Sequence, residues 1–360
     1  MLPYILLITI PTIVWGWDKF VHLDEDHPWA HKTKSSSITV FMLIFLLLLS
    51  LRGIKCGNDT IQYLRIFKQY SSKTMEQLLA NETYELGYKI LNHIVGSITN
   101  NYQYLIAVTS LLCVYPLWYF YKKESEIPVL TIALFLVVAP FSMYFSGIRQ
   151  AIAMSLGVFA WNAAKNKKIV RFVFWVIFAM LFHTSAFILL VLYPLYHIRI
   201  TKRWLWFVLP AMVMVYVTKD RIFNFIIEFL WKDYEGATET GSFMILILLI
   251  IFSIYSYIMV EDKALDNDTI GMRNLLLLSV VIQMFAMLHP LSMRMNYYFL
   301  IFIPILIPKI AKRCKKQFVN LSVISVTVMT LYFLYYFVNM MITDSDYLNI
   351  FPYIPFWNNP

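Results

Sequence analysis

The sequence predicts an all-α integral membrane protein that crosses the bilayer with about twelve helices. Hydrophobic residues make up 60% of its 360 residues, and only 14% are charged. Soluble domains carry about 25% charged residues, so this chain cannot cover a water-facing surface. Its apolar residues lie in long continuous stretches, whereas a transmembrane barrel would show short alternating strands.

The apolar stretches follow one another along the chain, and several are shorter than the ~20 residues that span a bilayer. The first stretch, residues 2–17, lacks the basic start and the cleavage site of a signal peptide, so it predicts a retained helix. Ile169–Ile198 is long for one helix and short for two, which predicts a hairpin or broken helix with His183 at the bend. Residues 85–100 predict a further, partly embedded helix. The predicted stretches are 2–17, 37–51, 101–121, 128–146, 148–164, 169–183, 185–197, 203–218, 242–260, 274–290, 296–310 and 318–341.

Lysine and arginine predict the orientation. Most of the 30 basic residues lie in one set of alternate loops, and such loops face the cytoplasm. Both termini are then extracytoplasmic, and so are the loops 52–100 and 219–241 and the tail 342–360, all within a single integral membrane domain, 1–360. This cytoplasmic excess explains the net charge of +9 better than nucleic-acid binding does. The basic loops are 18–36, 122–126, 165–171, 197–203, 261–273 and 309–316.

One charged residue, Arg149, lies in the apolar stretch "APFSMYFSGIRQAIAMSLGVFAW". Ser146-Gly147 is typical of a tight turn, which the predicted topology places at the outer membrane boundary. Arg149 then lies in the first turn of a helix that carries a stripe of small residues for close packing. Such an arginine faces protein or a wet cavity, because lipid exposure is costly; the alternative is an arginine that reaches the lipid headgroups. The stripe consists of Ala153, Gly157, Ala160 and Ala164.

Other polar residues lie at predicted segment ends on the outer side. Arg52 ends the second apolar stretch, with Lys55 and Asp59 close behind, while Arg294 and His183 lie at two further outer turns. Each alone could anchor a helix at the interface, but together they predict one shared site. Arginine forks bind phosphate oxygens, so the predicted ligand is a lipid-linked phosphate or diphosphate, whose head group lies at that depth.

Five short motifs resemble, in order, those of the EpsG/Wzy-type polysaccharide polymerase family. "RGIKCGNDTIQYLRIF" resembles the family's R-x(4)-G-x-D-x(3)-Y signature through Arg52, Gly57, Asp59 and Tyr63. "GIRQAIAMSL" is similar to the R-Q helix start, and "HTSAFILL" to the H-x-S-A element. "RMNYYFLIFIPIL" is similar to the R-x(2)-x-Y-F segment, and "FPYIPFW" to the Pro-Tyr ending.

The resemblance implies a glycosyltransferase at the outer face of a bacterial cytoplasmic membrane. It would join oligosaccharide units carried on undecaprenyl diphosphate into exopolysaccharide, capsule or O-antigen. The growing chain would be the glycosyl donor, and a new lipid-linked unit the acceptor. The implied partners are the lipid bilayer, this substrate, and possible export machinery such as a chain-length regulator.

The chemistry of such a transfer assigns roles to the residues. Positive charge stabilises the departing diphosphate, and the acceptor hydroxyl needs a base. His183 and Asp59 are the two candidate bases, and His183 is favoured because imidazole titrates near neutrality. A single displacement would invert the anomeric centre, with no cofactor and no metal expected. The predicted binding set is Arg52, Arg149, Arg294, Lys55, Tyr63, Gln150 and Tyr297.

Weaker patterns suggest alternatives. "HLDEDHPWAH" at 22–31 could bind a metal, although a solvated charged loop is the favoured interpretation. Asp344 and Asp346 form a D-x-D that is a very weak metal motif. The alternative functions are a membrane acyltransferase that modifies envelope polysaccharide and a flippase for lipid-linked oligosaccharide. A flippase needs charges along a path through the midplane, whereas these charges lie at one face.

Overall fold

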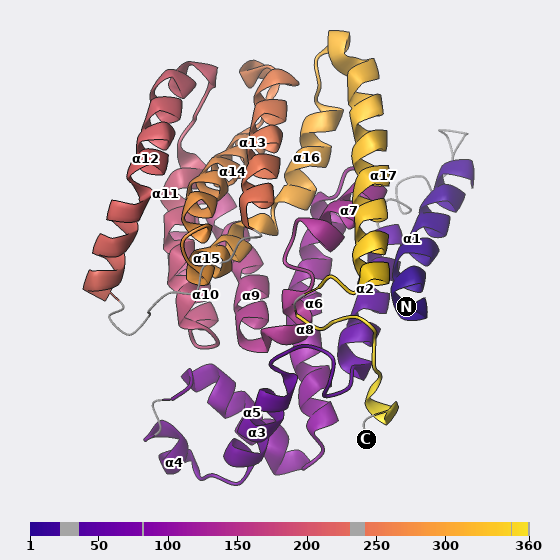
Figure 1. Cartoon of the computed structure of the whole chain (residues 1–360), viewed down its shortest axis with the longest axis vertical. Coiled ribbons are helices and arrows are strands. Elements are labelled where there is room, and N and C mark those ends of the chain that lie inside the picture. The colour runs from indigo at the N-terminus through magenta and orange to yellow at the C-terminus, as the bar shows by residue number, and fades with distance from the viewer. Residues whose placement is uncertain (22–35, 81–82, 231–241, 347, 359–360) are drawn as a thin grey trace.

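Helices account for the regular structure throughout the described part of the chain, as expected when continuous apolar stretches must pair their backbone groups internally. The computed structural model describes residues 1–21, 36–80, 83–230, 242–346 and 348–358. Across these residues it contains seventeen α-helices and no strand, which confirms the all-α class (Figure 1). The helices are α1 (Leu2–Val21), α2 (Ser36–Leu51), α3 (Thr60–Ser71), α4 (Met75–Leu79), α5 (Leu86–Ile98), α6 (Tyr102–Glu124), α7 (Pro128–Val137), α8 (Met143–Ser146), α9 (Ile148–Lys165), α10 (Ile169–Met180), α11 (Leu192–His197), α12 (Leu205–Leu230), α13 (Ser242–Ile258), α14 (Asn267–Ala286), α15 (Pro290–Leu300), α16 (Ile303–Lys312) and α17 (Val319–Thr343).

Length and composition identify fewer membrane spans than the apolar stretches predict. Among the described residues, three helices are long and apolar enough to cross a membrane, or up to five spans if each of two bent helix pairs counts as one. Several others, such as α2 and α7, are apolar but only 10–17 residues long. The number of about twelve therefore stays a prediction.

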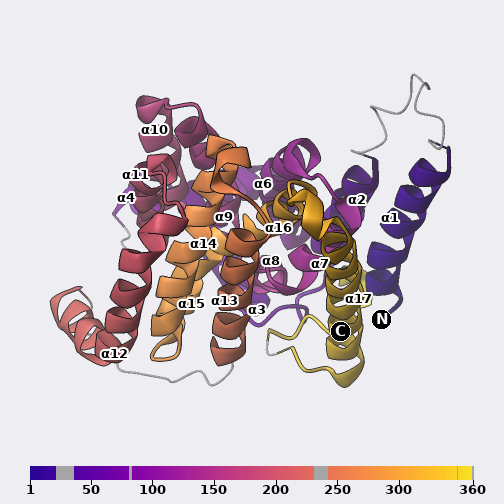
Figure 2. The ribbon, with the colours of Figure 1, turned by 90° about the horizontal axis from the view of Figure 1, so that it is seen from above.

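The long helices lie side by side, with α1 and α12 at opposite edges in both views and α9 between them (Figures 1 and 2). The small-residue stripe of α9 is buried as predicted. At Gly157 a Cβ would lie 3.1 Å from Leu189 Cδ1, so the neighbouring segment packs closely there.

The predicted outer loop 52–100, hereafter the outer segment, is folded. It contains α3, α4 and α5, which form a group at one end of the bundle (Figure 1). The predicted helix at 85–100 is confirmed as α5. Tyr102 joins this group to α6, because its hydroxyl donates to the Thr60 carbonyl at 3.2 Å.

The predicted loop 219–241 is helical at its start, because α12 continues to Leu230; its extracytoplasmic position stays a prediction. Lys219, Asp220 and Arg221 suggested a loop, yet no glycine or proline follows Pro210 within the helix. A short run of charges can occupy a solvated helix face without ending the helix. Residues 231–241 lie outside the described part of the chain.

The bend predicted at His183 is confirmed. α10 ends at Met180, and His183 is the extended residue before a 3₁₀-helix, η2 (Thr184–Val191), which leads into α11. The stretch is thus a broken helix, and the break places the imidazole at a helix end instead of within a helix.

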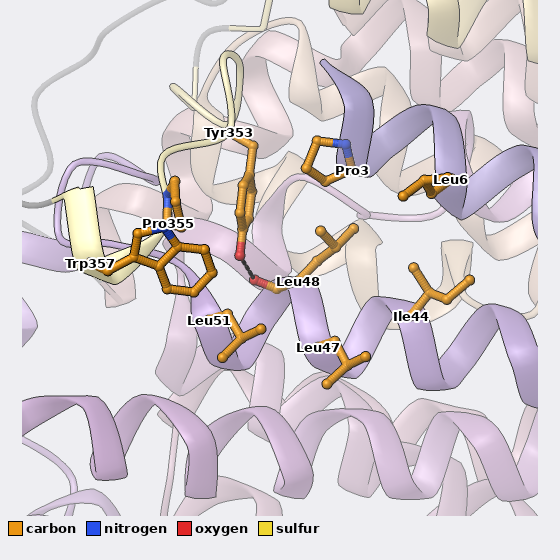
Figure 3. A pocket seen from close by; sticks show the side chains of 9 residues that line it. All are labelled: Pro3, Leu6, Ile44, Leu47, Leu48, Leu51, Tyr353, Pro355 and Trp357. Carbon is orange, nitrogen blue, oxygen red and sulfur yellow. Dashed lines mark hydrogen bonds between the residues drawn. The ribbon is translucent and has the colours of Figure 1, made fainter.

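The C-terminal segment folds back over the start of α1 and the end of α2. The Tyr4 hydroxyl donates to the Ile350 carbonyl at 2.6 Å, and the Gly53 amide donates to the Ile354 carbonyl at 2.8 Å. The Tyr353 hydroxyl donates to the Leu48 carbonyl at 2.9 Å, a bond drawn in Figure 3. Both described chain ends therefore lie against the same region of the bundle.

Between this segment, α1 and α2 lies an apolar cavity of about 280 Å³ (Figure 3). Pro3, Leu48, Tyr353 and Trp357 are among its lining residues, and none of the predicted site residues is. Its apolar and aromatic walls suit hydrocarbon and offer no group for acid–base chemistry.

The end of the bundle opposite to residues 52–100 carries a partly buried ionic cluster. Glu124 accepts from Lys309 at 2.5 Å and from Lys165 at 3.0 Å, and Lys165 also pairs with Asp268. These residues come from α6, α16, α9 and α14. Several of the basic loops predicted to share one side thus meet at one end, while the side that faces the cytoplasm stays a prediction.

Gly57 offers a test of the connection between α2 and α3. Its φ of +93° favours glycine, and a Cβ there would lie 2.3 Å from the Phe145 carbonyl oxygen. We expect Gly57→Ala to cost at least about 2 kcal/mol of stability, because strained backbone and a backbone clash add together. Thermal unfolding of detergent-purified protein checks this. Gly16→Ala is the matched control, since a Cβ at Gly16 meets nothing within 4 Å, and equal midpoints for the two variants would contradict the expectation.

Candidate active site

The site forms around the first turn of α9. Ser146 ends α8, Gly147 connects the two helices, and Arg149 follows at the second residue of α9. The turn is held from the outer segment, because the Asp59 amide donates to Ser146 Oγ at 3.3 Å. This contact brings the start of α3 to the start of α9, as the shared site requires.

Arg149 lies among residues of the outer segment, as expected of an arginine that faces protein. It forms an ion pair with Glu85, and its guanidinium carbon lies 5.0 Å from the centre of the Tyr84 ring. The Tyr63 hydroxyl is a further hydrogen-bonding neighbour of the guanidinium. The Arg149 side chain is only 24% exposed, so the outer segment largely covers it.

His183 reaches the same carboxylate from another direction. Its Nδ1 lies 3.2 Å from Glu85 Oε1, and the Thr184 amide donates to that oxygen at 3.2 Å. Within the described residues, His183 Nε2 has no hydrogen-bond partner, and the side chain is 24% exposed. One ring nitrogen is thus engaged and the other is available.

A close helix contact explains why Glu85 reaches both groups. Glu85 directly precedes α5, and two residues later the Gly87 amide donates to the Leu181 carbonyl at 2.8 Å. A Cβ at Gly87 would lie 2.8 Å from that carbonyl oxygen, so a larger residue would push α5 away from the end of α10. Gly87 therefore allows the approach that places Glu85 beside His183.

Glu85 is ionised across the physiological pH range. Burial by itself raises its pKa, but the hydrogen bond with His183 and the charge of Arg149 outweigh this and hold the pKa of Glu85 at about 2. The site thus contains one fixed anion between a fixed cation and an imidazole.

Asp59 lies one helical turn before Tyr63, whose amide donates to the Asp59 carbonyl at 3.0 Å. It is the residue before α3, and its carboxylate does not cap that helix. Tyr63 is influenced by the charges of both Arg149 and Asp59. The two candidate bases, His183 and Asp59, therefore border the same arginine region, although only His183 shares a carboxylate with Arg149.

The start of α15 adjoins this region through Gln150. Gln150 is buried and donates from Nε2 to the Arg294 carbonyl at 2.6 Å, while the Arg294 side chain is exposed. Tyr297 is buried. Tyr298, which the sequence did not single out, lies 3.0 Å from Ser185 Oγ through its hydroxyl and so contacts the H-x-S-A motif.

Arg52 and Lys55 are not brought into contact with Arg149. Arg52 is 2% exposed, and its Nη1 donates to the Leu49 carbonyl at 2.7 Å, where it satisfies the C-terminal end of α2. Lys55 is exposed and has no ion pair within the described residues. The predicted role of these two residues in binding diphosphate stays a prediction.

Metal binding finds no support in the described residues, which contain no group of three potential His, Cys, Asp or Glu ligands. Residues 22–31 lie outside the described part of the chain. Asp346 is buried and accepts from the Ile350 amide at 3.2 Å, so it organises the C-terminal segment. Metal independence remains a prediction.

Glu85 is the main residue that sequence reasoning missed. It is the first residue of the predicted 85–100 helix and matches no quoted motif, and its partners are 64 and 98 residues away in sequence. A carboxylate at the start of a partly embedded helix was the available indication.

The residues of this site lie within a range of the chain that matches one family. A family model described as the EpsG family matches residues 37–354. The chain belongs to the EpsG family. This confirms the resemblance, and EpsG membership supports a polysaccharide-polymerase type of function in exopolysaccharide synthesis by a multi-pass membrane protein. No curated protein and no solved structure matches the EpsG chain described here.

Proposed function

We propose that this protein polymerises lipid-diphosphate-linked oligosaccharide repeat units at the outer face of the bacterial cytoplasmic membrane. The observation that carries the proposal is the joining of Arg149 and His183 through Glu85, in a chain that belongs to the EpsG family. A cation and an available imidazole nitrogen are the two groups that glycosyl transfer from a diphosphate requires.

The proposed reaction is one displacement. His183 Nε2 takes the proton of the acceptor hydroxyl while that oxygen bonds to the anomeric carbon of the donor. The bond from the anomeric carbon to the diphosphate oxygen breaks, and its electron pair leaves with the diphosphate. Arg149 stabilises the departing charge, with the exposed Arg294 next to Gln150 as a second cation. The transfer inverts the anomeric centre.

The substrate is proposed to be an undecaprenyl-diphosphate-linked oligosaccharide. Its sugars would meet the exposed parts of the outer segment, and its lipid would stay in the bilayer. Export machinery, including a chain-length regulator, would take the product. The position of the charged site at one end of the bundle favours this function over a flippase. An acyltransferase remains the alternative enzyme.

A purified assay tests the function. The protein is reconstituted with lipid-linked repeat units in EDTA, and products are separated by size. We expect polymer to form and free lipid diphosphate to appear in proportion to the bonds made. Activity that returns only with Mg²⁺ or Mn²⁺ would contradict metal independence. If the repeat units stayed single both in EDTA and with added metal, the polymerase proposal would be contradicted.

The topology gives a separate prediction. We expect Asp59 and Trp357 to be extracytoplasmic and Lys167 and Lys315 to be cytoplasmic. Lys167 and Lys315 belong to the alternate loops that hold most of the basic residues, and such loops face the cytoplasm. Single cysteines at these positions, in a chain that lacks Cys56, Cys113 and Cys314, are treated with an impermeant thiol reagent in intact cells. Labelling at 315 without cell lysis would overturn the orientation.

A further inference from the structure

We propose that Glu85 is a positioning residue for the proposed base, and that it uses its two carboxylate oxygens to hold His183 and Arg149 in one working arrangement. The inference rests on the polymerase proposal for its catalytic meaning. It adds a residue that the family motifs quoted above do not include.

The first step concerns the tautomer of His183. Glu85 Oε1 lies 3.2 Å from His183 Nδ1 and also accepts from the Thr184 amide. An ionised carboxylate only accepts hydrogen bonds, so Nδ1 must carry the proton. In the neutral ring Nε2 then has the free lone pair, which is the atom a base needs. The backbone bond to Thr184 fixes the direction of approach.

The second step concerns the other carboxylate oxygen. Glu85 Oε2 pairs with Arg149, so the carboxylate charge is shared between a cation and an imidazole. Because the pKa of Glu85 is about 2, this anion persists throughout the pH range of an assay. Glu85 is therefore a poor proton acceptor itself, which leaves that role to His183 or Asp59.

The third step follows from the charges. Before reaction, Arg149 and Glu85 sum to zero and the imidazole is neutral. When His183 accepts the acceptor proton, the group of three gains one positive charge as the diphosphate gains negative charge. The arrangement thus develops charge opposite to that of the leaving group, which lowers the energy of the transition state.

Other charged or titratable groups face this arrangement. Tyr63 of α3 contacts Arg149, Tyr84 lies against its guanidinium, and the charge of Asp59 acts on Tyr63. Tyr298 of α15 reaches Ser185 in η2. In the described residues Glu85 is the one acid that pairs with His183. Removal of its charge should therefore destabilise the protonated ring more than any other neutral substitution nearby.

A kinetic experiment tests this role with Glu85→Gln, Glu85→Asp and the control Glu76→Gln. Glu76 lies in α4 of the same outer segment and pairs with no cation in the described residues. For Glu85→Gln we expect kcat to fall about 10²- to 10³-fold with little change in KM. The acid limb of kcat/KM should move to lower pH, because the protonated imidazole loses its anionic neighbour. Glu85→Asp should recover part of the rate, and its acid limb should lie nearer to that of the wild type. Glu76→Gln should match the wild type in both.

A second measurement needs no substrate, so it separates this inference from the polymerase proposal. Nitrogen NMR of histidine-labelled protein in detergent reports which ring nitrogen is protonated, with the His183 resonance assigned by its loss in His183→Gln. We expect the Nδ1–H form in the wild type and a mixture in Glu85→Gln. A wild-type tautomer in Glu85→Gln, or a uniform loss of rate at every pH with the acid limb in place, would reduce Glu85 to a structural contact and overturn the proposal.

Discussion

Arg149→Lys is expected to lose polymer formation almost as completely as Arg149→Ala, with a fall in kcat of about 10²- to 10³-fold for both. Lysine keeps the charge but replaces a planar fork of donors with a single ammonium. The guanidinium has to pair with Glu85, contact Tyr63 and lie against the Tyr84 ring while it binds a phosphate oxygen. An ammonium cannot hold that arrangement. In cells, single repeat units on lipid should accumulate and polymer should disappear.

The control for this experiment is Arg65, an exposed arginine of α3 that has no ion pair in the described residues. Arg65→Lys and Arg65→Ala should leave polymer length and rate near the wild-type values. Membrane abundance of every variant is measured by immunoblot, so that loss of protein is not mistaken for loss of catalysis. Normal polymer from Arg149→Lys would mean that a positive charge alone suffices. It would contradict the proposal that the forked guanidinium of Arg149 is needed to bind the diphosphate.

His183→Gln is expected to cost about 10²- to 10⁴-fold in rate, the usual contribution of a positioned general base. Glutamine has nearly the reach of histidine, but it cannot accept a proton near neutral pH. The wild-type rate should fall on the acidic side of neutral pH, because a protonated imidazole has no lone pair to take the proton of the acceptor hydroxyl. Glu85 cannot cause this fall, since its pKa of about 2 keeps it ionised there. The variant should lose this acid limb together with the activity.

The matched control is His93→Gln in α5, since His93 Nδ1 is buried without a hydrogen-bond partner in the described residues. It should retain both the rate and the acid limb. A His183→Gln enzyme with near-normal turnover and an unchanged acid limb would remove the imidazole from the mechanism. The role of base would then pass to Asp59, whose charge acts on Tyr63.

Continuous apolar stretches allowed the helical class to be predicted, because a backbone in lipid has few other ways to pair its polar groups. Helix ends were harder to predict. Residues 128–146 look like one stretch, yet α7 ends at Val137 and α8 begins at Met143. Pro140 lies in that break, and its missing amide and the constraint it places on the preceding residue favour a helix end. Apolar character alone does not register such a break.

The candidate site was predictable in part, and for a physical reason. Arg149 and His183 lie at breaks in apolar sequence, where a charged group is conspicuous. Glu85 lies in a polar segment, where a carboxylate is ordinary. Its importance comes from Gly87, which lets α5 meet the end of α10, and that meeting depends on three-dimensional packing. Arg52 is the opposite example. Its charge is prominent in the sequence, yet in the structure its side chain is buried against the Leu49 carbonyl of α2.

The return of the C-terminal segment over residues 53–58 has a consequence for biosynthesis. The amides of Gly53, Gly57 and Asn58 donate to the carbonyls of Ile354, Asn349 and Leu348, respectively. A ribosome makes residues 348–354 long after residues 53–58, so the connection that leads to Asp59 stays incomplete until residue 354 has been made. A nascent chain that is shorter than this therefore lacks these three bonds before α3. Completion of the outer segment is in this way delayed until the C-terminal segment is present.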